Sequence, residues 1–594
     1  MSEYQAPLKD MHFVINELSS LDKIARLPGF EDATTDMVEA ILEQAGVLAN
    51  EVFSPINQSG DECGTHLENG VVVSPAGFAD AYHQFVENGW QGISQSPEFG
   101  GQGLPYLVQS AATEMWSGSN LALALCPLLT SGAIEAISQH ASEALKLRFL
   151  RKMISGEWSG TMNLTEPQAG TDLAAVKTRA VPEGDYYRIT GQKIFITWGE
   201  HEMADNIIHL VLARLPDAPA GVKGISLFLV PKYHVNDDGT PGGRNDLKIV
   251  SLESKLGIHA SPTCVMSYGD GGGAIGYLVG EPNNGLACMF TMMNHARLEV
   301  GMQGVGLSEQ AYQRALAYAR ERVQGYAHGQ KDRVTIIHHA DVRRMLMQMR
   351  AISEASRALA YVSAAEYDFA HRCDTEEERL KHQRRIDLLT PVAKAWPTEM
   401  AQEVTSLGVQ VHGGMGFIEE TGAAQYMRDA RILTIYEGTT GIQGMDLIGR
   451  KLLRDKGMAM AELISELNAF KLELESDSEA PASIVRSFGR ALQALDETTG
   501  WILKQAADDA DLAGSVAVNY MMLVGHVVCG WLMAKSAILA QRHLVTGSDD
   551  NFYRNKVSTA IFFIEHILPR SKALRDTIRA GSKSVMRIPV DSFD

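Results

Sequence analysis

Strand-forming residues are confined to one stretch of this 594-residue chain, and helical patterns occupy the rest. Between about residues 155 and 280, short runs rich in Val, Ile, Phe and Tyr alternate with clusters of Gly, Pro, Asn and Asp, as in strands joined by turns. On both sides apolar residues recur at helical spacing. The sequence therefore predicts an α+β chain, with a compact antiparallel β domain between helical regions.

This change of pattern divides the chain into four predicted domains. They are an N-terminal helical domain (1–157), a middle β domain (158–284), a C-terminal helical bundle (285–455) and an additional helical domain (456–594). A chain of this length can hold several domains, each with its own core. Within the last domain, residues 475–483 are predicted to be a linker or a helix boundary.

Charge and cysteine content narrow the class of function. The formal net charge of −19 disfavours a surface that follows nucleic-acid phosphates. The six cysteines lie far apart and form no CxxC pair, so we expect a reducing compartment and neither a zinc site nor a disulfide framework. Residues 1–20 contain no apolar segment of the kind found in secretory signals, and the expected location is cytoplasmic.

One apolar segment is long enough to span a bilayer. Residues 512–534 contain no Asp, Glu, Lys or Arg. Asn519, His526, several small residues and the absence of a second such segment favour a buried helix in a bundle instead. A weak peripheral membrane contact is the remaining alternative.

Glu437 has the best chemical context of any carboxylate in the chain. It precedes Gly438, and a helical pattern follows, with apolar residues at Ile442, Met445, Ile448 and Leu452. We therefore expect Glu437 on a tight loop before a helix that Thr439 or Thr440 caps. Apolar neighbours could raise its proton affinity, which suits removal of a proton from carbon. Support of the helix N-terminus is the alternative role, and this pattern alone leaves both open.

Other candidate binding residues are weaker signals. Thr165, Thr171 and Thr197 offer hydroxyl groups and Phe195 offers a flat ring near predicted strand ends, although turns and strands use the same residue types. The glycine-rich stretch 407–417 could present backbone N–H groups to a phosphate, or could be a plain turn.

Four ordered motifs carry a family resemblance. NLTEPQAGTD, ARERVQG, VQVHGGMGF and RDARILTIYEGTTGIQ together resemble the acyl-CoA dehydrogenase family of flavoproteins, over about residues 80–455. The start and the helical tail further resemble a long bacterial subgroup that includes 3-methylmercaptopropionyl-CoA dehydrogenase and fatty acyl-CoA enzymes. The resemblance implies FAD between the middle and C-terminal domains, α,β-desaturation of an acyl-CoA thioester, and electron-transferring flavoprotein as the acceptor.

The resemblance also implies roles for individual residues. Glu437 would be the catalytic base, with Gly438 and Arg297 near the substrate. Beside the flavin ring it places Thr165, Phe195, Thr197 and Thr439. Thr171 would contact the flavin phosphate or the CoA arm, and the FAD of a neighbouring subunit would be reached by Arg322, Gln324, Gln410 and Gly414. Some family members carry the base near Arg297, but this chain has Ala296 there, and Glu299 is interpreted as a partner of Arg297.

The sequence leaves alternatives open for the substrate and the function. The apolar run Leu121–Thr130 favours a medium- or long-chain acyl group, with 3-methylmercaptopropionyl-CoA as an alternative substrate. An O2-using oxidase and a nucleic-acid-protecting flavoprotein of the same fold are alternative functions; Glu437 and the net charge count against the second. A structural helical protein without FAD is the third alternative function. Because the helices after residue 455 would cover a tetramer surface, we expect a homodimer.

Overall fold

The computed structural model describes residues 4–477, 480–547 and 550–593, and they form two compact units. The helical unit comprises Met1–Glu43 and Val300–Asp594, and the β-containing unit comprises Gln44–Glu299. The first 43 residues thus belong to the helical unit, whereas the sequence analysis grouped them with residues 44–157.

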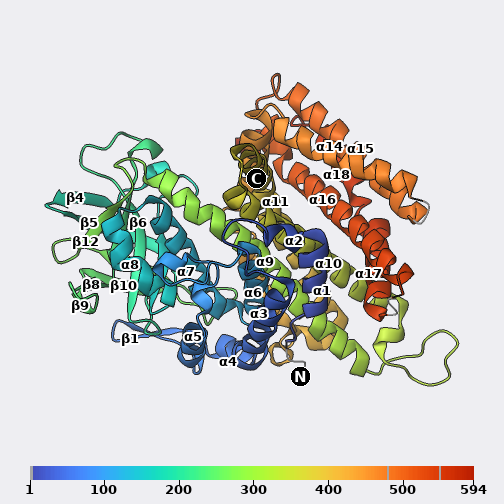
Figure 1. The fold of residues 1–594 in the computed structure, drawn as a ribbon, viewed down its shortest axis with the longest axis horizontal. Coiled ribbons are helices and arrows are strands. Elements are labelled where there is room, and N and C mark those ends of the chain that lie inside the picture. Colours follow the sequence, from blue (N-terminus) through green and yellow to red (C-terminus); the bar gives the residue numbers. More distant parts are fainter. Residues whose placement is uncertain (1–3, 478–479, 548–549, 594) are drawn as a thin grey trace. The chain divides into compact units, whose positions relative to one another are not determined.

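The β-containing unit consists of short helices followed by the strands of one main sheet (Figure 1). Its helices are α3 (Thr35–Val47, which begins in the other unit), α4 (Asn57–Cys63), α5 (Phe78–Glu87), α6 (Tyr106–Ser119), α7 (Leu121–His140) and α8 (Glu143–Ser155). Its strands are β1 (His66–Glu68), β2 (Val71–Val73), β3 (Trp158–Asn163), β4 (Arg179–Glu183), β5 (Tyr186–Thr197), β6 (Asn206–Ala213), β7 (Ser226–Pro231), β8 (Tyr233–Val235), β9 (Pro241–Arg244), β10 (Leu247–Leu252), β11 (Thr263–Tyr268) and β12 (Ala274–Val279). The β1–β2 hairpin lies within the part predicted to be helical.

The main sheet has the strand order β10-β11-β5-β12-β7-β6-β3, with β4 paired to β5. The prediction of an antiparallel domain is wrong at one edge, because β3 pairs with β6 in parallel. Parallel neighbours need a long crossover connection, and residues 164–205, which contain β4 and β5, supply it.

Both faces of the sheet are covered. Along β6, Ile208, Leu210 and Leu212 pack into a core with residues of α7 and α8, whereas Val211 and Ala213 join a second core on the opposite face. This alternation is the period of two that a strand imposes. Because both faces are buried, β6 reads as the nearly continuous apolar run NIIHLVLA.

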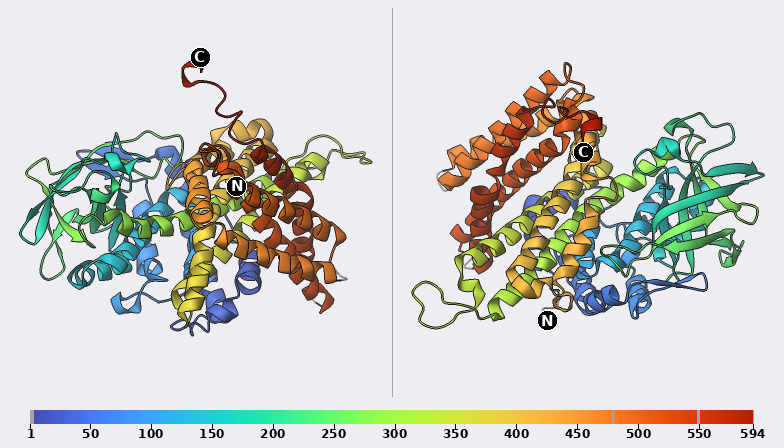
Figure 2. Two further views of the ribbon diagram at one scale, coloured as in Figure 1. Left: turned by 90° about the horizontal axis from the view of Figure 1, so that it is seen from above. Right: turned by 180° about the vertical axis from the view of Figure 1, so that it is seen from behind.

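The helical unit is a bundle of long helices (Figure 2). Its helices are α1 (Leu8–Phe13), α2 (Leu21–Ile24), α9 (Gly285–Glu321, which begins in the other unit), α10 (Ala340–Arg372), α11 (Glu376–His412), α12 (Ala423–Leu433), α13 (Thr440–Met445), α14 (Met458–Ser476), α15 (Ala482–Gln505), α16 (Leu512–Val545), α17 (Asn551–Phe562) and α18 (Arg570–Arg579). The predicted boundary at 475–483 separates α14 from α15, apart from residues 478 and 479, which lie outside the described residues.

α16 is the apolar segment that could have crossed a membrane, and it is a packed helix of the bundle. It contacts α10 and α11 as well as α15, α17 and α18. A Cβ atom at Gly525 would lie 2.3 Å from Cδ1 of Trp396, so glycine is what allows α16 to approach α11 this closely. By length and composition α7 also passes as a membrane span, which contradicts the expected absence of a second segment. The most apolar windows of α7 and α16 are 89% and 67% buried.

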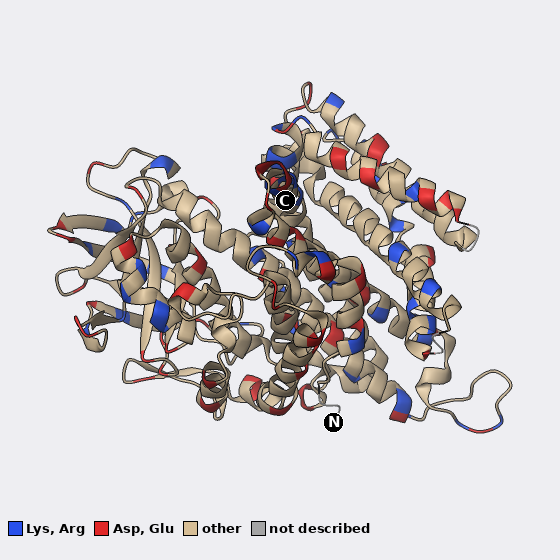
Figure 3. Ribbon diagram, in the orientation of Figure 1, with Lys and Arg blue, Asp and Glu red and all other residues tan. Residues whose placement is uncertain are grey.

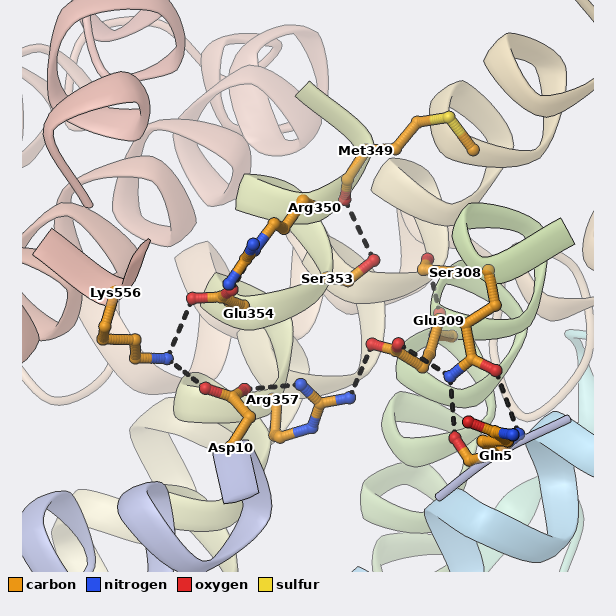
Figure 4. A network of polar contacts seen from close by, with 12 residues as sticks. Gln5, Asp10, Ser308, Glu309, Met349, Arg350, Ser353, Glu354, Arg357 and Lys556 are labelled. Atoms are coloured by element: carbon orange, nitrogen blue, oxygen red, sulfur yellow. Dashed lines mark hydrogen bonds and ion pairs between the residues drawn. The ribbon is translucent and has the colours of Figure 1, made fainter. Parts of the chain in front are cut away.

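A buried polar network joins the N-terminal helix to distant parts of the same unit (Figure 4). Asp10 on α1 accepts hydrogen bonds from Arg357 on α10, at 2.6 Å, and from Lys556 on α17. Lys556 also donates to Glu354 at 3.0 Å, and Arg357 donates to Glu309 at 2.9 Å. Buried charges of opposite sign are thus paired across four helices.

Candidate active site

Glu437 lies on the short loop between the end of α12 at Leu433 and the start of α13 at Thr440. Its side chain is partly buried, and its φ of +54° lies in the left-handed region that non-glycine residues rarely adopt. Such a conformation costs free energy and persists only where neighbouring contacts hold it. Glu437 is therefore held in one orientation by the loop, as a catalytic group requires.

Hydrogen bonds within the loop and α13 hold this conformation. The hydroxyl of Thr439 accepts a bond from the N–H of Ile442, which confirms the predicted helix cap. The N–H of Thr440 donates to the carbonyl of Thr434 at 3.1 Å. The fully buried amide of Gln443 donates to the carbonyl of Glu437 itself at 3.0 Å. Sequence analysis missed the role of Gln443, because an isolated glutamine in a helical pattern carries no signal.

The tyrosine beside Glu437 is partly buried and hydrogen-bonded. The Tyr436 hydroxyl donates to the side-chain oxygen of Gln303 on α9. Burial raises the pKa of the Tyr436 phenol well above its usual value, and the charge of Glu437 adds to the rise. Tyr436 therefore stays neutral, and Glu437 is the acid–base group of this pair.

The predicted apolar stripe after Glu437 is wrong in part. Met445 is 40% exposed, whereas Gln443, Gly444, Leu447 and Ile448 face the core. The helix changes to π geometry at Asp446 and keeps it to Leu453. Ile448 and Leu452, which lie within this segment, are buried as predicted.

In the β-containing unit, Phe195 and Thr197 stand at the end of β5. The register between β5 and β11 shifts opposite Phe195, because Cys264 pairs with Ile196 but Met266 pairs with Lys193. Phe195 has a φ of +60° in this bulge, and 58% of its surface is exposed. A bulge re-aims a side chain. Here it presents a flat aromatic ring outward, next to the hydroxyl-bearing Thr197.

Thr165 is brought to the same place by the backbone. The N–H of Ile194 donates to the carbonyl of Thr165 at 2.9 Å, which fixes Thr165 beside the Phe195 bulge. Thr171 lies on the exposed part of the following loop. The structure thus groups Thr165, Phe195 and Thr197.

Glu166 anchors the loop that carries these threonines. Its buried carboxylate accepts bonds from the Lys177 N–H at 2.8 Å, from the Thr178 hydroxyl at 2.6 Å and from the ammonium ion of Lys193 at 2.8 Å. Burial alone would raise the pKa of Glu166, but the charge of Lys193 and these hydrogen bonds outweigh it and lower the pKa to about 2. Glu166 is therefore ionised at neutral pH.

We expect Glu166→Gln to lower the free energy of unfolding by about 3 kcal/mol at pH 7, because it leaves the buried Lys193 without its carboxylate. The pKa of Glu166 is lower in the folded state, so its stabilisation is complete above pH 4.5 and declines as the pH falls toward 2. Urea unfolding at pH 7 and between pH 4.5 and 3.5 would measure this. The difference in unfolding free energy between wild type and variant should become smaller as the pH falls. Glu183→Gln, which removes the exposed ion pair with Arg188, is the control and should change stability little. A constant gap, or equal losses in both variants, would contradict the assignment.

Arg297 and Glu299 are both buried on α9. Arg297 donates to Asn294 at 3.3 Å, whereas Glu299 accepts a bond from Gln109 at 3.3 Å and lies 3.9 Å from His295. A small cavity of about 10 Å³ borders Glu299 and the α7 residues Ala124, Pro127 and Leu128.

The residues predicted to reach a neighbouring subunit's FAD are exposed. Arg322 and Gln324 follow the end of α9, and Gln410 and Gly414 lie at the end of α11. The ring of Tyr318 stacks on that of His412 at 4.5 Å, which brings these two helix ends together. The helical unit therefore groups these four residues on one surface.

The chain matches models of known protein families along most of its length. Family models match the N-terminal domain (39–157), the middle domain (161–270) and the C-terminal domain (283–453) of acyl-CoA dehydrogenases, and an acetyl-CoA dehydrogenase C-terminal-like model matches 460–589. The chain belongs to the acyl-CoA dehydrogenase family. These enzymes oxidise the CH–CH bond of an acyl-CoA, and the predicted fold class is confirmed.

Relatives match over the whole length. The 3-methylmercaptopropionyl-CoA dehydrogenase of Ruegeria pomeroyi is 47% identical and covers 98% of this chain and 99% of its own. A butyryl-CoA dehydrogenase of Syntrophomonas wolfei is 33% identical, over 99% of both chains. Among solved structures, an acyl-CoA dehydrogenase of Bacillus anthracis complexed with FAD has a TM-score of 0.74 at 21% identity and covers 94% of this chain and 90% of its own.

Proposed function

We propose that this protein is an FAD-dependent dehydrogenase that introduces an α,β double bond into a short acyl-CoA thioester, with 3-methylmercaptopropionyl-CoA as the first candidate substrate. The observation that carries the reaction is the strained, partly buried loop that holds Glu437 within an acyl-CoA dehydrogenase chain. The full-length similarity to the Ruegeria enzyme supports the substrate.

Glu437 removes the proton from the α-carbon of the acyl group. That proton is far too weakly acidic for a carboxylate in water, so the site must stabilise the charge that develops on the thioester oxygen. The backbone N–H of Glu437 is the donor that we assign to this oxygen. The fixed orientation of the loop keeps the carboxylate and this donor aligned without reorganisation.

The chain's own residues fit a flavin. The outward-facing ring of Phe195 offers a flat surface, and Thr165 and Thr197 offer hydroxyl groups beside it. When bound, FAD supplies the acceptor for the hydride that leaves the β-carbon. We assign Thr171 and Thr439 to the same cofactor, and Arg322, Gln324, Gln410 and Gly414 to the FAD of a second copy.

A short acyl group replaces the medium or long chain that the sequence favoured. The cavity bordered by Ala124, Pro127 and Leu128 of α7 has room for about one water molecule, and polar side chains of Gln91, Gln109, Thr113, Ser131 and Glu299 share its lining. This volume holds no acyl group of either length, so the short acyl group is proposed from the full-length relatives, which are a 3-methylmercaptopropionyl-CoA and a butyryl-CoA dehydrogenase.

A turnover series over saturated acyl-CoAs of graded length, with 3-methylmercaptopropionyl-CoA included, tests the substrate. We expect kcat/KM to be highest for 3-methylmercaptopropionyl-CoA and to fall as the chain lengthens. A maximum at eight or more carbons would overturn the substrate, but not the reaction. Reduction of electron-transferring flavoprotein without peroxide release would favour a dehydrogenase over an oxidase.

The proposal also covers assembly and location. We propose a cytoplasmic homodimer; light scattering would test the dimer. The exposed apolar side chains Met415, Phe417 and Ile418 beside Gly414 support contact with a second copy. The net charge of −19 counts against nucleic-acid protection, and the charged residues of α14 are mainly acidic (Figure 3).

A further inference from the structure

The ammonium ion of Lys394 bridges the two sides of the Glu437 loop. Lys394 lies on α11, and its side chain is fully buried. Its ammonium ion donates to the carbonyl of Leu433, at 2.7 Å, and to that of Gly438, at 2.9 Å. Leu433 is the last residue of α12 and Gly438 directly follows the base, so one side chain spans the whole loop.

The position of this lysine is built into the packing of α11. A Cβ atom at Gly301 of α9 would lie 2.3 Å from the carbonyl oxygen of Ala393, so α9 and α11 touch through their backbones next to Lys394. A buried ammonium ion is costly unless its donors are satisfied. The carbonyl at the C-terminal end of α12 carries partial negative charge and is a favourable partner for a cation.

We propose that Lys394 is a positioning residue for the catalytic base: its ammonium ion closes the loop that carries Glu437 and favours the ionised carboxylate. The proposal rests on the proposed dehydrogenase function. Its second part follows because a positive charge bonded to the residue after Glu437 stabilises a nearby negative charge.

Other charged groups lie around the loop and also affect the charge on the Glu437 carboxylate. On α12 these are Asp429 and Arg431, and Arg431 donates to the hydroxyl of Thr434. On α11, Glu399 accepts a bond from the hydroxyl of Thr440. Tyr436 stays neutral, and α13 carries no charged residue. Of the cations Lys394 and Arg431, Lys394 is the one bonded to the peptide that follows Glu437.

Lys394→Met removes the charge and the bridge while keeping an apolar chain of similar length. We expect kcat to fall about 100-fold through misplacement of the base. We also expect the acidic limb of the kcat–pH profile to move up by about one pH unit, because the base then holds its proton to higher pH. Stopped-flow bleaching of the flavin by substrate should slow in parallel, whereas FAD content should remain.

Two variants separate charge from bonding. Gln443→Leu removes the neutral bond to the carbonyl of Glu437, so it should lower kcat without moving the acidic limb. Lys394→Arg keeps the charge and should keep the wild-type limb. An active wild type together with an unchanged limb and bleaching rate in Lys394→Met would overturn this proposal alone. Loss of FAD binding by both Lys394 variants, but not by Gln443→Leu, would show a structural role and overturn it too. A wild type that desaturates no acyl-CoA would instead overturn the proposed function.

Discussion

Glu437→Gln should keep FAD bound and lose acyl-CoA dehydrogenation by about 10⁴-fold, the upper end of what a general base contributes. The amide has nearly the shape of the carboxylate but cannot take the α-proton. Because the backbone of Glu437, its bond from Gln443 and the bond between Thr440 and Thr434 are unaffected, the loop should keep its conformation.

Steady-state turnover and single-turnover flavin bleaching would measure this loss. Glu437→Asp is the matched control, because aspartate tolerates a positive φ and keeps the carboxylate but sets it back by one methylene group. The turnover and bleaching rates of Glu437→Asp should lie between those of the wild type and those of Glu437→Gln. Near-normal turnover in Glu437→Gln, with FAD bound, would show that another group is the base.

Asp10→Ala should give the largest loss of stability, about 3 to 5 kcal/mol of unfolding free energy, because it leaves Arg357 and Lys556 buried without this carboxylate (Figure 4). Burial alone would raise the pKa of Asp10, but Lys556 and Arg357 outweigh it and keep the pKa below its ordinary value. The stability that ionised Asp10 contributes is therefore present above pH 3.8, its ordinary pKa, and is lost as the pH falls below that value.

The neighbouring exposed pair provides a close control. Lys9 bonds Asp550 at 2.9 Å, so it also links the N-terminal segment to the start of α17, but both side chains are exposed. Lys9→Ala should cost less than about 1 kcal/mol. Chemical unfolding at pH 7 would measure the loss of unfolding free energy in both variants. Equal losses would show that burial of the network contributes little to stability.

Periodicity and motif order were enough to predict the helical and β regions, because those signals are local. The errors arose at single positions and pairings. Met445, in the predicted apolar stripe, is exposed, and at β3 a crossover made one strand pair parallel.

The supporting groups around the candidate site could not be predicted. Lys394 and Gly438 are 44 residues apart and meet only because α11 packs against the end of α12. Phe195 and Thr165 come together through a bulge and a single backbone bond, which no composition or spacing encodes. Motifs identified the groups that bind or react, whereas tertiary packing determines how they are held.

The bond between Asp10 and Lys556 spans 546 residues of sequence. A ribosome adding about 5 to 20 residues per second needs roughly half a minute to two minutes to make that interval. During synthesis, residues 44–299 can complete their own core, and Arg357 can bond Asp10, before Lys556 has been made. The N-terminal helix is among the first parts to emerge, yet its buried network is complete only when translation is nearly finished.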